Sequence, residues 1–149
     1  MRTVIQRVSE ASVVIKDEKV ANIQQGLLVL IGIEIEDTEE DVHWLAKKIS
    51  TLRIFSDLEG KMNNSILDID GDIIVVSQFT LHAKTKKGTR PSYMKSARPK
   101  KAIPLYEKFK KELSEAIAKQ VYSGQFGSDM KVSLVNDGPI TILLDSKNK

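Results

Sequence analysis

The sequence predicts an α+β fold, in which two helices pack on a curled, mainly antiparallel β-sheet or barrel. Three observations lead to this prediction. Short apolar stretches occupy the first third and the last part of the chain, two longer segments repeat their apolar residues at helical spacing, and the connections are short. With 149 residues and no internal repeat or linker, the chain is expected to form one domain over residues 1–149.

The first third of the chain is predicted to be rich in strands. Apolar and polar residues alternate up to residue 15, and Asp17-Glu18 marks a hairpin turn after them. Gln25-Gly26 marks a second turn. The run from Leu27 to Ile33 is almost entirely apolar, which is typical of a central strand.

A first helix is predicted to begin at Asp37 or Thr38, because either side chain can cap the free amides of a first turn. Acidic residues follow at once, and Lys47 and Lys48 lie in the last turn, which matches the helix dipole. The buried face is expected to comprise Val42, Leu45, Ala46 and Ile49.

A second helix is predicted over roughly residues 99–122. Pro99 or Pro104 can be its first residue, since a proline there loses no hydrogen bond. Ser123-Gly124 is expected to end it. The remaining elements are a short strand at 52–55, turns at 57–60 and 68–72, a strong strand at 73–81, and two strands within 131–144 joined by a hairpin turn at 136–139.

Positive charge is concentrated in the segment from Lys84 to Lys101. It holds eight basic residues and no acid, while the whole chain has a net charge of only +3, so the remainder is net negative. Such a segment suits a polyanion such as nucleic acid. The alternative is a solvated surface loop whose lysines only aid solubility.

Several classes of chemistry are disfavoured by composition. The chain has no cysteine, which removes disulfides, thiolate zinc sites and a cysteine nucleophile. His43 and His82 are the only histidines, and neither has an obvious carboxylate partner, so a zinc hydrolase and a Ser-His-Asp triad are both disfavoured. The acidic run 68–72 resembles a calcium loop but lacks the later glutamate, so a turn is expected.

We therefore expect neither a metal nor a cofactor. The chain start lacks the apolar stretch of a signal peptide, and the longest apolar run is far shorter than the ~20 residues of a membrane span. A soluble, cytoplasmic protein with no membrane partner is the expectation.

The candidate chemistry lies where the strong strand gains polar side chains, at Ser77, Gln78 and Thr80. On a strand, Gln78 and Thr80 share one face, and Ser77 and Phe79 share the other. A rigid strand end fixes where such groups point. Taken alone, Thr80 can be an ordinary strand residue and Ser77 a satisfied core hydroxyl.

The segment 136–141 also has two interpretations. It can be a plain hairpin turn. Alternatively the Gly138-Pro139 bond can be cis, which occurs in roughly 5–6% of such bonds and turns two carbonyl oxygens to one side. Such a pair would accept hydrogen bonds from an ammonium group.

Taken together, the sequence motifs resemble those of the D-aminoacyl-tRNA deacylases, also called the D-tyrosyl-tRNA deacylase family. The resemblance covers nearly the whole chain and includes five stretches in order: Val4-Ile5-Gln6-Arg7-Val8, Gly60-Lys61-Met62-Asn63, Ser77-Gln78-Phe79-Thr80-Leu81, Lys87-Gly88-Thr89-Arg90-Pro91-Ser92 and Asn136-Asp137-Gly138-Pro139-Ile140-Thr141. It implies a homodimer that hydrolyses the ester between a D-amino acid, or glycine, and the tRNA 3′ end.

The resemblance also implies roles for particular residues. Ser77, Gln78, Phe79 and Thr80 would form the catalytic strand end, with direct attack by water preferred over Thr80 as nucleophile. The resemblance assigns the remaining roles as follows: Gly138 and Pro139 would reach into the partner subunit's site and reject L-amino acids, Arg7 and Asn136 would support them, and Lys86, Lys87 and Arg90 would bind tRNA. The rival from another class is a non-catalytic RNA-binding β-barrel; DNA is not expected as a partner.

Overall fold

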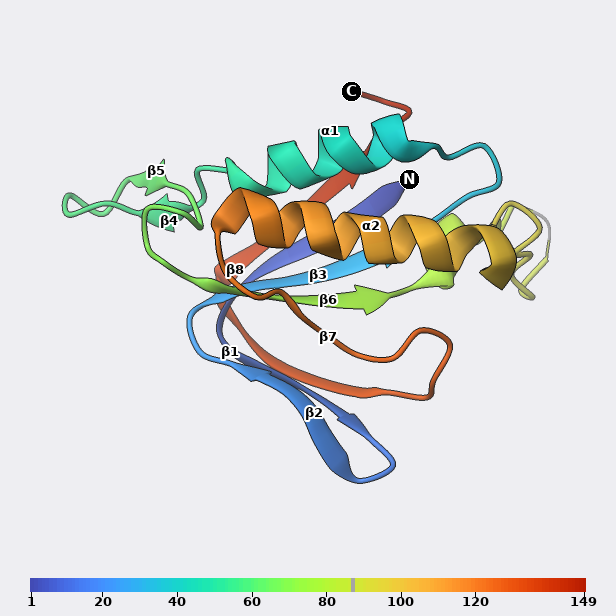
Figure 1. Ribbon diagram of the computed structural model, residues 1–149, viewed down its shortest axis with the longest axis horizontal. Helices are drawn as coiled ribbons and strands as arrows, with labels where there is room; N and C mark the ends of the chain where they lie inside the picture. Colours follow the sequence, from blue (N-terminus) through green and yellow to red (C-terminus); the bar gives the residue numbers. More distant parts are fainter. Residues whose placement is uncertain (87) are drawn as a thin grey trace.

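The computed structural model describes residues 1–86 and 88–149. Within them, a curled mixed sheet carries two helices on one face (Figure 1). The sheet has the strand order β2-β1-β3-β6-β7, and β8 pairs with β1. Its strands are β1 (Arg2–Ile15), β2 (Glu18–Ile23), β3 (Gly26–Gly32), β6 (Asp72–Ser77), β7 (Tyr122–Ser123) and β8 (Lys131–Asp145). The predicted fold class is confirmed.

The first strand, β1, organises the sheet because it is long enough to pair with three others. Along one edge its first half pairs with β3 and its second half with β2, all antiparallel. Along the other edge it pairs with β8 from residue 2 to residue 14. This arrangement, with bulges in the pairings of β1 with β2 and with β8, curls the sheet until it is nearly closed.

The predicted central strand is confirmed as β3, which lies between β1 and β6. Its pairing with β6 is parallel. Both of its faces are covered: Leu27, Val29 and Ile31 face the helices, and Leu28 packs inside the curl with Ile74 of β6. Burial on both faces explains why this stretch is continuously apolar rather than alternating.

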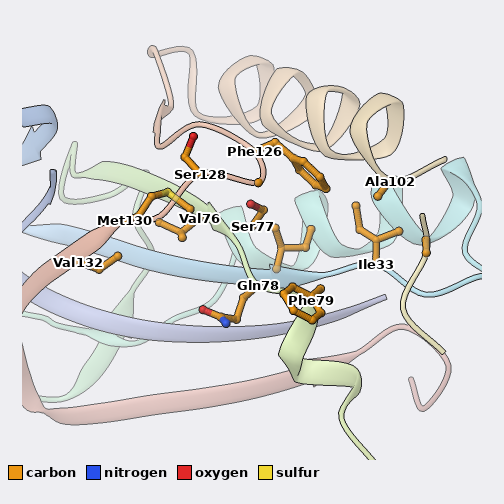
Figure 2. Close-up of a pocket in the computed structure, with 13 residues that line it drawn as sticks. Ile33, Val76, Ser77, Gln78, Phe79, Ala102, Phe126, Ser128, Met130 and Val132 are labelled. Atoms are coloured by element: carbon orange, nitrogen blue, oxygen red, sulfur yellow. The ribbon is translucent and has the colours of Figure 1, made fainter. Parts of the chain in front are cut away.

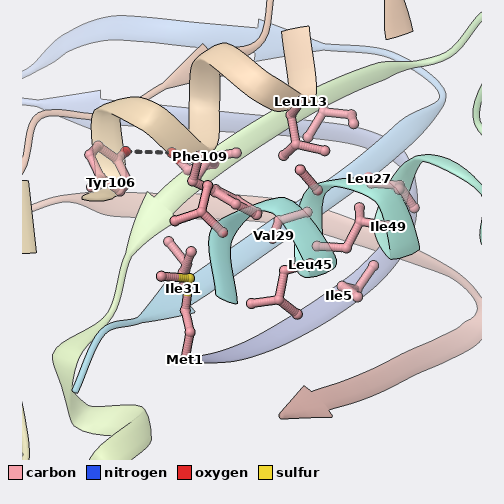
Figure 3. Close-up of a cluster of buried hydrophobic side chains, with 14 of the residues drawn as sticks. Met1, Ile5, Leu27, Val29, Ile31, Leu45, Ile49, Tyr106, Phe109 and Leu113 are labelled. Atoms are coloured by element: carbon pink, nitrogen blue, oxygen red, sulfur yellow. Dashed lines mark hydrogen bonds between the residues drawn. The ribbon is translucent and has the colours of Figure 1, made fainter. Parts of the chain in front are cut away.

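The main core lies between the sheet and the helix layer (Figure 3). Helices α1 (Glu39–Ser50) and α2 (Pro99–Ile117) lie side by side over it. Leu45 and Ile49 of α1 and Phe109 of α2 are fully buried there. Tyr106 of α2 donates a hydrogen bond to the carbonyl of Val75 in β6 at 3.0 Å, which joins the helix to the strand that leads into the candidate site.

The first helix begins and ends as predicted. Thr38 is the N-cap, and its backbone amide donates to Oδ2 of Asp41 at 2.8 Å, as in a capping box. The four apolar residues predicted for its inner face are all buried. The carboxylates in its first turn and the lysines in its last turn complement the helix dipole.

The second helix begins at Pro99, one of the two predicted starts, but it ends five residues earlier than predicted. Ala118 adopts a left-handed conformation with φ of 52°, which stops the helix. Tyr122, expected in the helix, instead pairs with Ile74 as strand β7. The last residue predicted for α2 from helical spacing thus belongs to the edge strand of the sheet.

Two short strands form a hairpin that projects from one end of the molecule (Figure 1). They are β4 (Phe55–Ser56) and β5 (Met62–Asn64), and the predicted turn at 57–60 connects them. The predicted strand at 52–55 is therefore displaced toward the C-terminus, and its partner was not predicted. The hairpin turn after β1 is confirmed at Lys16 and Asp17, whose φ angles of 48° and 65° suit a tight turn between twisted strands.

The last strand corrects a prediction. Residues 131–144 were expected to form two strands joined by a hairpin turn, but β8 runs in one direction along β1 throughout. Asn136 pairs with Val8 and Thr141 pairs with Gln6, so four residues of β8 lie opposite the single residue Arg7. The segment 137–140 is thus a large bulge rather than a turn.

The two ends of the chain lie close together (Figure 1). The amino group of Met1 contacts the carboxylate of Asp37 and donates to Oγ of Ser146 at 2.8 Å. Lys147 donates to Oδ2 of Asp41 at 2.8 Å. No helix within residues 1–86 and 88–149 is long and apolar enough to cross a membrane.

Candidate active site

The polar segment after β6 is a tight turn rather than a strand end. β6 stops at Ser77, and the next amide, of Gln78, donates to the carbonyl of Ile31 at 2.7 Å. Residues Phe79–His82 then form one turn of 3-10 helix. The prediction of a strand to residue 81 is therefore wrong for its last four residues.

This turn changes how the predicted residues face one another. Thr80 does not share a strand face with Gln78; instead Nε2 of Gln78 donates to Oγ1 of Thr80 at 2.6 Å. An amide nitrogen that donates has no free pair with which to take a proton. The hydroxyl of Thr80 therefore contacts a donor, not a base, in this arrangement.

A cavity of about 280 Å³ opens at this turn (Figure 2). Figure 2 shows Ser77 pointing toward the segment that carries Phe126 and Ser128, while Gln78 extends on the other side of the strand. Helix α2 contributes Ala102 to the wall. Apolar walls with a few convergent polar groups are typical of a small-molecule site.

Part of this lining was not predicted from sequence. Between β7 and β8, Phe126, Gly127 and Ser128 lie against the turn, and Met130 and Val132 close one side. The sequence offers one signal, an aromatic residue beside a glycine in an otherwise polar connection. Only the fold shows that this connection returns to the end of β6.

The bulge in β8 presents Gly138 and Pro139 at the surface, joined by a cis peptide bond. Arg7 holds the first residue of the bulge in place. Its Nε donates to the carbonyl of Asp137 at 2.9 Å, and its Nη1 donates to the carbonyl of Ile54 at 2.7 Å. The Arg7 side chain is only 11% exposed. Its guanidinium thus ties the bulge to the segment that precedes β4.

Asn136 fixes the same bulge from within. Its Oδ1 accepts from the amide of Ile140 at 2.8 Å, and its Nδ2 donates to Oγ1 of Thr141 at 3.0 Å. Gly138 has a φ of 135°, and a Cβ built there would lie 2.9 Å from Ile140 Cγ1 and 3.1 Å from Nη2 of Arg7. The position therefore requires glycine for its conformation and for its space.

The bulge and the cavity lie apart within one chain. Neither Gly138 nor Pro139 lines the cavity. Through the pairing register, the bulge is level with Leu27 of β3 and Ile73 of β6, four residues before Ser77. That places it about 13 Å away along the strands, with β1 and β3 in between.

Residues 84–86 and 88–92 of the basic segment belong to an exposed loop near the turn. The backbones of Lys84 and Ser92 exchange two hydrogen bonds of 2.8 and 2.9 Å and close the loop at its base. Lys86 and Arg90 are exposed on it, and neither takes part in an ion pair within the described residues. Lys87, also predicted to bind tRNA, lies outside the described residues.

The remaining candidates lie elsewhere. His43 is 76% exposed on the outer side of α1, and its Nδ1 lies 3.4 Å from a carboxylate oxygen of Glu112, a partner that sequence did not reveal. His82, the last residue of the 3-10 turn, is buried. In the acidic run, Asp68 accepts from the amide and hydroxyl of Ser65, both at 2.7 Å, as expected of a turn. Across residues 1–86 and 88–149, no group of three or more His, Cys, Asp or Glu residues could hold a metal ion.

A curled sheet under two helices, with a pocket where a polar turn follows a buried strand, defines a class of small α+β proteins. Within that class, the chain belongs to the D-Tyr-tRNA(Tyr) deacylase family, whose model matches residues 4–145. It is 60% identical to a protein of Flavobacterium johnsoniae and to one of Bacteroides fragilis, each named D-aminoacyl-tRNA deacylase. Both alignments cover 100% of this chain and 99% of the relative.

Solved structures share the fold. One described as a c-Myc DNA unwinding element binding protein superimposes with a TM-score of 0.91 at 36% identity, over 97% of this chain and 98% of that one. Another, described as a probable eukaryotic D-amino acid tRNA deacylase, gives a TM-score of 0.82 at 18% identity, over 96% of this chain and 97% of that one. The second shows likeness of fold alone.

Proposed function

We propose that the chain hydrolyses the ester bond between a D-amino acid, or glycine, and the 3′ end of tRNA, releasing the free amino acid and tRNA. The observation that carries the proposal is the cavity at the end of β6, where the polar turn meets apolar walls in a member of a deacylase family. The exposed basic loop beside it suits the phosphates of the acceptor stem. The reaction requires no organic cofactor, and its substrate belongs to the cytoplasm.

In this proposal water attacks the ester carbonyl directly. The amides of Phe79 and Thr80 open the 3-10 turn, where no carbonyl of the same turn can accept from them, so they are available to an oxyanion. One such donor is typically worth about 2.7–4 kcal/mol in the transition state. The ribose 2′-hydroxyl of the terminal adenosine orients the water, and Gln78 positions that nucleotide.

Chiral selection is assigned to the bulge of a second copy of the chain. Gly138 and Pro139 are exposed, rigidly supported by Arg7 and Asn136, and out of reach of their own cavity. In a homodimer the bulge of one subunit enters the cavity of the other. Its carbonyls hold the substrate ammonium and leave no room for an L side chain, whereas glycine has no side chain to exclude.

The test is a hydrolysis assay with D-aminoacyl-, L-aminoacyl- and glycyl-tRNA. We expect the D and glycyl esters to be cleaved and the L ester to persist. Equal rates for both hands would refute the role of the bulge, and intact esters in all three would refute the esterase.

The second candidate is nucleic-acid binding without chemistry. One solved neighbour is described as a DNA-binding protein, and a basic loop attracts any polyanion. Binding of single-stranded DNA or tRNA with no cleavage of any ester would favour this candidate. The low aromatic content, 5%, argues against a protein that holds long single strands by stacking.

A further inference from the structure

A second hollow of about 610 Å³ adjoins the catalytic cavity. The two share four lining residues, Phe79, Ala97, Phe126 and Gly127. The second hollow adds residues from the segment between the basic loop and α2, among them Tyr93 and Met94, and Ile35 from the segment after β3. A ligand that leaves the catalytic cavity past Phe79 therefore enters a second preformed space.

The second hollow displays apolar side chains to solvent. Phe79 is 55% exposed, Met94 80% and Ile35 54%. The rings of Phe79 and Tyr93 meet edge to face, with centroids 5.0 Å apart and an angle of 72° between planes. Exposed large apolar groups gathered at one place mark a binding surface. Aromatic rings among them suit a partner with a flat π-face that can stack, such as a nucleobase.

Hydrogen bonds hold the walls of this hollow in place. Ser96 Oγ donates to the carbonyl of Phe79 at 3.0 Å, which ties the segment directly to the catalytic turn. The amide of Ala97 donates to the carbonyl of Ile33 at 2.9 Å, and the amide of Ile35 donates to the carbonyl of Lys95 at 3.0 Å. A site that exists before binding loses little affinity to ordering.

Charge indicates which flat partner fits. Arg98 lines the hollow and is exposed, and it belongs to the segment 84–101, which contains no acidic residue. A base attached to a phosphodiester satisfies both features, because its ring meets the aromatic wall and its phosphate meets the guanidinium. An apolar protein segment would leave this positive charge unmatched.

We propose that the second hollow binds the base of the penultimate nucleotide of tRNA, the cytidine that precedes the terminal adenosine. This inference rests on the proposed function, in which the terminal adenosine and its ester occupy the first cavity. The polynucleotide then continues past Phe79 into the second hollow, with its phosphate near Arg98. The enzyme reads two nucleotides of the acceptor end rather than one.

The experiment compares two small substrates, a D-aminoacyl ester of adenosine and the same ester of the dinucleotide cytidylyl-adenosine. For the unaltered enzyme we expect kcat/KM to be on the order of five- to a hundredfold higher with the dinucleotide, the range that one stacked base provides. Tyr93→Ala and Met94→Ala should reduce this ratio. Tyr93→Phe, which keeps the ring, should preserve it.

Leu58→Ala is the matched control, because Leu58 is fully exposed on the projecting β4–β5 turn, outside both hollows. It should leave the ratio unchanged. A ratio near one for the unaltered enzyme, or a ratio that Tyr93→Ala and Met94→Ala leave unchanged, overturns the second subsite. Cleavage of the adenosine ester in the same assay shows that the proposed function stands; no cleavage of either ester overturns both.

Sedimentation of the same variants tests whether the second hollow instead binds a second copy of the chain. If Tyr93→Ala or Met94→Ala changes the assembly state and not the substrate ratio, the hollow is a protein contact and the proposal is wrong. An unchanged assembly state with a reduced ratio supports the nucleotide subsite.

Discussion

Gln78 and Thr80 form a contact that decides how the turn can act. Oγ1 of Thr80 accepts a hydrogen bond from Nε2 of Gln78 at 2.6 Å, so its partner cannot serve as a base. An unactivated hydroxyl is a poor nucleophile at neutral pH. This contact of Thr80 therefore favours the proposed mechanism, in which backbone amides stabilise the oxyanion and the ribose 2′-hydroxyl of the substrate orients the attacking water.

Thr80→Ala tests this mechanism. We expect kcat for D-aminoacyl-tRNA to stay within a few-fold of the unaltered enzyme, because in the proposed mechanism no covalent step uses the hydroxyl. Removal of a true nucleophile lowers kcat by on the order of 10⁴ to 10⁶. A loss of that size in single-turnover hydrolysis, together with an acyl-enzyme trapped in a related variant, would refute direct attack by water and identify Thr80 as the nucleophile.

Arg7 is the residue that holds the bulge, and its two bonds point to different backbone segments. Arg7→Lys keeps the charge but cannot make both bonds with one ammonium group. Because a hydrogen bond to a charged group is worth about 1.5–3 kcal/mol, we expect the ratio of D to L hydrolysis to fall by about tenfold or more.

The same change at Arg53 is the control for Arg7→Lys. Arg53 is next to Ile54 in the segment that precedes β4, but its side chain donates to the carbonyl of Asn63 at 2.7 Å and makes no bond to the bulge. Arg53→Lys should leave the ratio of D to L hydrolysis unchanged. An equal fall in both variants, or no fall in Arg7→Lys, would separate Arg7 from chiral selection.

The sequence predicted which residues form the candidate site, but it did not predict the conformation that the structure gives them. Local pattern assigned Thr80 to a strand because Phe79 and Thr80 favour strands and follow an apolar run. The strand ends at Ser77 because β3, its pairing partner, ends at Gly32. A long-range partner thus decides a local conformation, and the sequence pattern does not contain that information.

At the scale of elements, the sequence predicted a helix or strand correctly where its apolar residues all face a single core. Helix α1 has its N-cap at Thr38, one of the two predicted caps, and its apolar stripe lies within the twelve residues that follow, as predicted. The predicted end of α2 was wrong because Val121 and Tyr122 continue the helical spacing, yet the chain has already left the helix there and Tyr122 pairs at the sheet edge. The prediction of two strands in place of β8 was wrong because turn-forming residues at 136–139 build a bulge opposite Arg7 instead of reversing the chain.

The basic loop at 84–92 is the element that should contact phosphates. If Lys86 and Arg90 each neutralise one phosphate, replacing both with alanine should reduce the slope of log affinity against log salt by about 1.4–1.8. Fluorescence anisotropy with uncharged tRNA at several salt concentrations measures this slope. The alanine variant of Lys131, an exposed lysine 3.4 Å from Asp17 on another hairpin, is the control and should keep it. An unchanged slope in the double variant would make the loop ordinary solvated surface.

At the scale of the whole molecule, the two ends of the chain and the start of α1 form one polar cluster. Asp37 and Asp41 receive the amino group of Met1, the ammonium of Lys147 and the amide of Thr38. The cluster lies where strand β1 begins and strand β8 ends. Sequence could not predict it, because it joins the N-terminus, the start of α1 and the C-terminal segment: Asp41 and Lys147 are 106 residues apart, and no spacing links them.

The cluster makes the stability of the fold depend on pH. Burial acts to raise the pKa of Asp41, but hydrogen bonds from Lys147, Ser146 and Thr38 outweigh it and hold the pKa well below its usual range. Hydrogen bonds from the amide of Lys147 and from Arg2 likewise outweigh burial and lower the pKa of Asp145. A depressed pKa in the folded state means that the unfolded chain takes up the proton first.

The contribution of Asp41 is therefore complete above the unfolded pKa of about 4 and is lost as pH falls toward the folded pKa. We expect Asp41→Asn to lower the free energy of unfolding by about 1–3 kcal/mol at pH 7, and this difference to shrink steadily between pH 5 and pH 3. Urea unfolding at each pH measures it. Asp17→Asn, on a residue 92% exposed in the hairpin turn, is the control and should stay within about 0.5 kcal/mol of the unaltered protein throughout. A difference for Asp41→Asn that is constant with pH would mean that the carboxylate stabilises the fold by packing rather than by charge.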